Sequence, residues 1–245
     1  LNCLDALAEG AKTALPVGIA CSLVGVIIGT LTLTGAASTV AQLIIEVGKN
    51  NLFLSLFLTM IMCLILGMGI PTIPNYIITS AVAGPALYEL GVPLIVSHMF
   101  VFYFGILADL TPPVALACFA AAPIAKESGF KISLQAVRVA MAGFLIPYMA
   151  VYSPVLMLQG YNGDTLSFTV SFLYILAKTV VAILLLGIAV IGHLKKEINA
   201  FERFFCLVIA CFLITALPIT DEIAGGLLVI YLLMNWLKNK KVLAK

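Results

Sequence analysis

Long apolar stretches, separated by short polar ones, run along the whole chain. About 20 apolar residues span a bilayer as a helix, and several stretches approach or exceed that length. The strict apolar/polar alternation of barrel strands is absent from the sequence. We therefore predict an all-α membrane protein, a transmembrane helix bundle. The plain spans expected are residues 15–33, 136–158, 168–192, 204–217 and 223–237.

Residues 51–90 depart from this pattern. Two apolar arms, 52–66 and 76–90, flank the sequence GMGIPTIPN at residues 67–75. An arm of about 15 residues reaches only ~22 Å, short of the ~30 Å hydrocarbon core. Two glycines and two prolines also weaken helix at the join. We expect a re-entrant hairpin that enters and leaves the membrane by the same face.

A second departure lies in residues 94–125. This apolar stretch is too long for one straight span, and the sequence ADLTPPVA interrupts it in the middle. Pro112 and Pro113 force Thr111 away from the α-helical region. We therefore predict a discontinuous helix. The mildly amphipathic residues 35–50, which precede the hairpin, are expected to lie at the membrane interface.

Composition supports the membrane class. The chain is 63% hydrophobic and 10% charged, with a mean hydropathy of +1.19. A net charge of +2 is too small to indicate a nucleic-acid partner, so the lipid bilayer is the partner expected. Six scattered cysteines without ligand spacing are typical of small buried hydrophobes. The start, LNCLDALAEGAK, has no initiator methionine, and we expect a piece of a longer polypeptide.

Basic residues predict the topology. Ten of the thirteen gather in three groups, and the polar loops between the last spans contain none, which places these groups and the C-terminus in the cytoplasm. Lys49, in a loop on the outer side, is an exception to this assignment. The hairpin then opens to the outer face. His98 and His193, at the ends of apolar stretches, are interpreted as interfacial residues. The three groups are Lys126, Lys131 and Arg138; Lys195, Lys196 and Arg203; and Lys238, Lys240, Lys241 and Lys245.

The two breaks carry the candidate chemistry. Irregular backbone survives at membrane depth only against protein or water, so two neighbouring breaks indicate one shared polar cavity. Freed carbonyls coordinate Na⁺, and half-helix N-termini attract anions. Asp109 is either a ligand or proton site, or a cap of the half-helix after it. The candidate ion- and substrate-binding residues are Gly67, Gly69, Ile70, Pro71, Thr72, Asn75, Asp109, Thr111, Pro112 and Pro113, with Gly69, Thr72 and Thr111 as candidate Na⁺ ligands.

Enzymatic signatures are missing from the sequence. There is no P-loop, no HExxH and no GxSxG elbow, and Asp109 has no companion acid that would make an aspartyl protease pair. We predict that the chain is not an enzyme and uses no cofactor, with Na⁺ only as a coupling ion.

Residues 64–125, LILGMGIPTIPNYIITSAVAGPALYELGVPLIVSHMFVFYFGILADLTPPVALACFAAAPIA, resemble the large membrane subunit of tripartite ATP-independent periplasmic (TRAP) transporters. The likeness is to fused permeases that work with TAXI-type binding proteins, and it extends over about residues 6–158. Many members of the wider family have an acidic residue where this chain has Ile70 and Pro71, so ligands at that point are expected to be carbonyls.

The resemblance implies Na⁺-coupled uptake of organic acids, commonly carboxylates, delivered by a periplasmic TAXI-type solute-binding protein. It implies a bacterial or archaeal cytoplasmic (inner) membrane and an elevator-type transporter of two inverted repeats. Residues 1–158 would be the second repeat and residues 159–245 three additional helices. Residues 67–75 would form the tip of the second hairpin, facing an unwound point at residues 110–113. The first hairpin would belong to the remainder of the fused permease.

Two alternatives stay open at the level of the sequence. One is an anion symporter of the related superfamily, coupled to Na⁺ or H⁺, that needs no binding protein. The other is a non-transport membrane subunit in which Asp109 is buried for stability.

Overall fold

The computed structural model describes residues 2–161, 163–192, 198–214 and 220–231. Within these ranges every regular element is a helix, which confirms the all-α class. The chain divides into two compact units, Leu1–Val137 and Arg138–Lys245. This division falls before residue 158, where we expected the second repeat to end; the repeat assignment itself stays a prediction.

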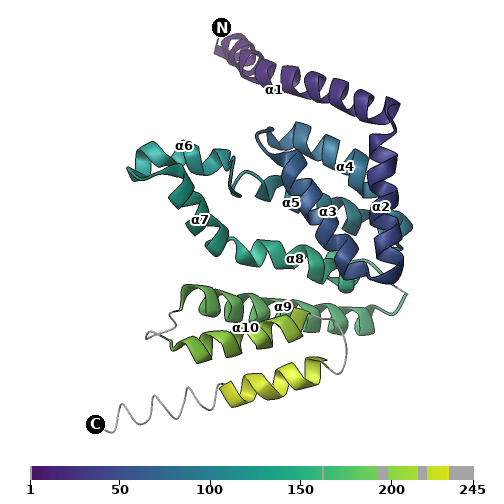
Figure 1. Cartoon of the computed structure of the whole chain (residues 1–245), viewed down its shortest axis with the longest axis vertical. Helices are drawn as coiled ribbons and strands as arrows, with labels where there is room; N and C mark the ends of the chain where they lie inside the picture. Colours follow the sequence, from purple (N-terminus) through teal and green to yellow (C-terminus); the bar gives the residue numbers. More distant parts are fainter. Residues whose placement is uncertain (1, 162, 193–197, 215–219, 232–245) are drawn as a thin grey trace. The chain divides into compact units, whose positions relative to one another are not determined.

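The first unit is built around a bundle of α2, α3, α4 and α5, with α1 packed against α2 and α4 (Figure 1). Helix α1 begins well before the expected residue 15, because Ala, Leu, Glu and Lys upstream of it are good helix formers. The elements are α1 (Asn2–Leu33), α2 (Ala36–Asn50), α3 (Leu52–Gly67), α4 (Thr72–Glu89), α5 (Leu94–Leu107), α6 (Leu116–Ala125) and α7 (Gly129–Val139).

Both predicted breaks are present in the first unit. Helices α3 and α4 form the hairpin and pack against each other, with only residues 68–71 between them. Helices α5 and α6 are separated by residues 108–115. The fully buried rings of Phe100 and Phe104, with centroids 4.8 Å apart, place α5 in the core of the bundle. The prediction of one hairpin and one discontinuous helix is therefore confirmed as backbone geometry.

The second unit is a smaller helical layer. Its elements are α8 (Met141–Tyr152), the short 3-10 helix η1 (Pro154–Met157), α9 (Thr165–Ile191), α10 (Ala200–Ile214) and a helix at residues 220–231. Helix α9 packs along α10 and also contacts α8 and η1. The core of this unit is mainly aliphatic, with Ile209 and Ala210 fully buried.

Helix α9 is the best candidate for a plain membrane span. Its 27 residues correspond to about 40 Å, more than the hydrocarbon core requires. Among the described residues it is the one helix long and apolar enough to span, or one of three if two bent pairs each count as a span. Asp164 caps its start through the amides of Leu166 and Ser167. Arg203 caps its end by donating to the carbonyls of Ala189 and Val190.

The other predicted C-terminal spans need correction. The prediction of a single helix at 136–158 is wrong, because one helix ends at Val139, the next begins at Met141, and that helix stops at Tyr152. Pro154 explains this stop, since a proline disfavours the α region in the residue before it. The span expected at 204–217 begins earlier, at Ala200. Residues 215–219 and 232–237 of the last two spans, and His193 with Lys195, Lys196 and the lysines of the C-terminus, lie outside the described residues.

Candidate functional site

The tip of the hairpin is a four-residue turn between two helices. Helix α3 ends at Gly67, and the amide of Ile70 reaches back to the Gly67 carbonyl at 3.5 Å. Gly69 has φ +76°, a left-handed conformation that glycine adopts without strain. Pro71 precedes the first residue of α4, Thr72. The break is therefore narrower than GMGIPTIPN, because TIPN already forms the first turn of α4.

Gly67 allows three segments to meet at this point. A Cβ atom there would lie 2.8 Å from the side-chain nitrogen Nδ2 of Asn75, 2.8 Å from the Gly105 carbonyl oxygen and 2.9 Å from the Ala108 Cβ. Real Cβ atoms essentially never approach backbone so closely, so only glycine fits. The end of α3, the start of α4 and the end of α5 therefore form one tight contact, which we call the tip junction.

Asn75 is the polar centre of the tip junction. It is 1% exposed, and its Nδ2 donates a hydrogen bond to the Gly105 carbonyl at 2.6 Å. Its other side-chain atom, Oδ1, is buried without a hydrogen-bond partner. Such an unpaired buried acceptor is uncommon and requires an explanation, because leaving it unsatisfied costs about 1–3 kcal/mol.

The second break adjoins this centre through Ala108 and Asp109. One Asp109 carboxylate oxygen, Oδ1, is also buried without a hydrogen-bond partner. Its backbone carbonyl accepts from the Ala117 amide at 3.2 Å and so ties the break to the first turn of α6. Helix α6 starts after left-handed Ala115 and has no side-chain cap, so the interpretation of Asp109 as its cap is wrong.

Thr111 has a defined role in the break. Its hydroxyl donates to the Leu107 carbonyl at 2.6 Å, which satisfies one of the carbonyls left free at the end of α5. The hydroxyl oxygen keeps lone pairs that can still accept or coordinate. The hydrogen bond is thus compatible with the predicted ligand role and does not test it.

The remaining predicted residues surround the tip junction at the surface of the breaks. A Cβ on Gly69 would lie 3.6 Å from Val114, so the two break segments lie close to each other. Ile70 and Pro112 are half-buried, whereas Gly69, Pro71, Thr72 and Pro113 are exposed. Within the described residues there is no group of three or more His, Cys, Asp or Glu that could hold a metal ion.

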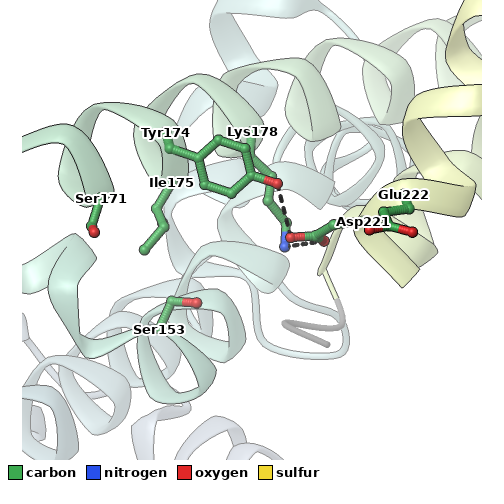
Figure 2. A pocket seen from close by; sticks show the side chains of 7 residues that line it. All are labelled: Ser153, Ser171, Tyr174, Ile175, Lys178, Asp221 and Glu222. Carbon is green, nitrogen blue, oxygen red and sulfur yellow. Dashed lines mark hydrogen bonds and ion pairs between the residues drawn. The ribbon is translucent and has the colours of Figure 1, made fainter. Parts of the chain in front are cut away.

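Three structural features escaped the sequence analysis. Gly105 carries the carbonyl that accepts the hydrogen bond from Asn75, but no feature of the sequence marks this glycine as different from its apolar neighbours in α5. His98 is paired, since its Nδ1 lies 2.9 Å from the Tyr76 hydroxyl between α5 and α4. Lys178 of α9 forms an ion pair with Asp221, which also accepts from Tyr174 (Figure 2). A lysine in the middle of an apolar run indicates a buried polar partner, so the sequence contained a signal for Lys178 although not for the identity of its partner.

Comparison with known families identifies a relationship. Residues 2–164 match the family model described as "Tripartite ATP-independent periplasmic transporter, DctM component". The matched range contains the hairpin, the discontinuous helix and the whole tip junction. Searches of curated proteins and of solved structures gave no match.

Proposed function

Because the chain belongs to the DctM family, the large permease component of TRAP transporters, we propose that it serves Na⁺-coupled uptake of small organic acids. The family consists of integral inner-membrane proteins that carry out secondary transport of solutes, not enzymatic chemistry. Its members work with a periplasmic binding protein and small-subunit partners. The coupling ion, the carboxylate cargo and a TAXI-type binding protein are the parts that we propose.

The tip junction and the adjoining second break supply the observation that supports this function. Two buried side-chain oxygens, Asn75 Oδ1 and Asp109 Oδ1, have no hydrogen-bond partner beside two interrupted helices. Unwound backbone carbonyls are ligands that transporters use for Na⁺ at broken helices, and unpaired side-chain oxygens beside them have the lone pairs to complete such a site. We propose that Na⁺ binds at these breaks, with Gly69, Thr72 and Thr111 contributing oxygens.

An anionic cargo suits the same place. Helices α4 and α6 both begin at the breaks, so the positive ends of their dipoles lie where a carboxylate would be neutralised. A Na⁺ ion bound beside them would strengthen that attraction and couple the two ligands. The carboxylate class and the TAXI-type partner rest on the likeness of residues 64–125 to the fused permeases.

The test is uptake by the assembled transporter in proteoliposomes at graded Na⁺ concentrations. Thr111→Ala and Asn75→Ala should raise the Na⁺ concentration for half-maximal uptake by roughly tenfold, if each loses about 1.4 kcal/mol of ion binding. Thr169→Ala is a matched control for Thr111, because its hydroxyl makes the same type of bond to the Thr165 carbonyl in the second unit.

Unchanged Na⁺ dependence in both variants would remove these residues from the ion site. Each measurement is repeated with and without the periplasmic binding protein. Uptake that proceeds equally well without it would favour the binding-protein-independent symporter. Loss of uptake in Asp109→Asn at normal membrane abundance would exclude a purely structural subunit.

A further inference from the structure

A second polar region lies in the second unit, mostly beyond residue 164, where the family match ends. It is a cleft of about 570 Å³ in the second unit. Four of its residues come from one stretch of α9, and the rest from residue 153 and the helix at 220–231 (Figure 2). We call it the α9 cleft. Its lining residues are Ser153, Ser171, Tyr174, Ile175, Lys178, Asp221 and Glu222.

The α9 cleft reaches the middle of a membrane-length helix. Ser171 is six residues and Lys178 thirteen residues after Thr165, which corresponds to ~9 Å and ~20 Å along the helix axis. Asp221, expected in a loop, instead lies in a helix beside Lys178. Charged side chains at such depth are costly in an apolar phase and are a functional candidate by default.

An ammonium group already occupies part of this site. Lys178 Nζ lies 2.5 Å from Asp221 Oδ1, and their side chains are only 7% and 18% exposed. The Tyr174 hydroxyl donates to the other carboxylate oxygen of Asp221 at 3.1 Å. The chemistry built here is thus recognition of an ammonium by a carboxylate that a phenol holds in place.

The charge balance of the cleft is negative. Lys178 neutralises Asp221, while the Glu222 carboxylate has no ion-pair partner among the described residues. A cleft with one uncompensated charge and apolar walls concentrates ions of the opposite sign. Among the described lining residues an anion would meet two carboxylates and one ammonium, which is already paired. The α9 cleft therefore favours cations, whereas the proposed cargo site at the tip junction favours anions.

Size and geometry decide what kind of cation fits. The volume is in the range of small-molecule pockets and much larger than a single ion needs. The lining polar groups are spread along ~10 Å of α9 instead of converging on one point. The Tyr174 ring supplies an aromatic surface on which an organic cation can rest. We propose that the α9 cleft is a second binding site, selective for small organic cations of the alkylammonium class.

The test measures access and charge preference by chemical labelling. In the purified full chain carrying Ser171→Cys, trimethylammonium-ethyl methanethiosulfonate should modify position 171 faster than sulfonatoethyl methanethiosulfonate. Both rates are normalised to those of a free thiol. We expect the normalised rate of the cationic reagent to exceed that of the anionic reagent by roughly threefold to tenfold at low salt, which is the effect of one nearby charge. Mass spectrometry of the peptide that contains residue 171 separates this reaction from those of the native cysteines.

Matched variants identify the source of the preference. Glu222→Gln in the Ser171→Cys chain should bring the ratio close to that of the free thiol. Leu173→Cys is the control, because Leu173 is 56% exposed on the same helix but does not line the cleft. It should show no preference for the cationic reagent. Tetramethylammonium should slow labelling at 171, and acetate at equal ionic strength should not.

The proposal is overturned if position 171 is unreactive, if the anionic reagent reacts faster, or if Glu222→Gln leaves the ratio unchanged. Equal slowing by tetramethylammonium and acetate would also overturn it, because it would reflect ionic strength alone. None of these outcomes depends on uptake, so the proposed transport function and the α9 cleft can fail separately.

Discussion

The tip junction and the α9 cleft place polar atoms among apolar helices in two different ways. At the tip junction the helices are interrupted, and the polar atoms are mainly backbone carbonyls and an amide side chain around Gly67. In the α9 cleft the helix continues unbroken from Thr165 to Ile191, and the polar atoms belong to charged side chains.

This difference predicts different sensitivities. The tip junction depends on backbone segments approaching closely, so it should fail when a side chain is added. The α9 cleft depends on a balance of charges, so it should fail when one charge is removed and its partner is left alone. Substitutions that add volume at the tip junction and substitutions that remove a charge from the α9 cleft can therefore distinguish how the two regions are stabilised.

Adding volume at the tip junction should give the largest effect. Gly67→Val would push a branched side chain into the Gly105 carbonyl and Ala108, and we expect a loss of about 3 kcal/mol in the free energy of unfolding. Thermal unfolding in detergent measures this loss. Uptake should also be abolished, because the breaks could no longer meet.

Gly25→Val is the control for that variant. Gly25 lies in α1 with nothing within 4 Å of a built Cβ, so the stability should be unchanged or slightly higher. A Gly67→Val protein with the stability of the parent would show that the three segments do not meet as described.

Removing one charge from the α9 cleft should have the next largest effect. Lys178→Met leaves Asp221 without its ammonium, and we expect a loss of roughly 2 kcal/mol, less than for a fully buried pair because Asp221 is partly exposed. Adding Asp221→Leu should recover most of that loss, since no lone charge remains. If the double variant were less stable than Lys178→Met, the loss in Lys178→Met could not come from leaving the Asp221 charge without its partner. Thermal unfolding of both variants measures the cycle.

The sequence predicted the first unit better than the second for a physical reason. Glycine and proline act locally, so the ends of α3 and α5 could be placed from the sequence to within a few residues. The sequence could not show which carbonyl accepts the hydrogen bond from Asn75, because the position of Gly105 opposite Asn75 depends on how the helices pack. The pair of Lys178 and Asp221 joins residues 43 apart in the chain, which no local pattern specifies.

Two tyrosines allow the finest comparison, with the smallest effects. Tyr76 shares a hydrogen bond of 2.9 Å with His98 between α4 and α5, whereas Tyr174 donates to Asp221 in the α9 cleft. Each Tyr→Phe change removes one hydroxyl and should cost about 1 kcal/mol or less, with the smaller loss at the more exposed Tyr174.

Their effects on uptake should nevertheless differ. Tyr76 joins the two helices that carry the breaks, so Tyr76→Phe should lower uptake by several-fold through a loosened tip junction. Tyr174→Phe should leave uptake unchanged, because Asp221 keeps its ion pair with Lys178. Both variants are measured by thermal unfolding and by uptake into proteoliposomes under an imposed Na⁺ gradient. Equal losses of uptake in the two variants would mean that the α9 cleft takes part in transport as directly as the tip junction does, and the separation between the two regions would have to be abandoned.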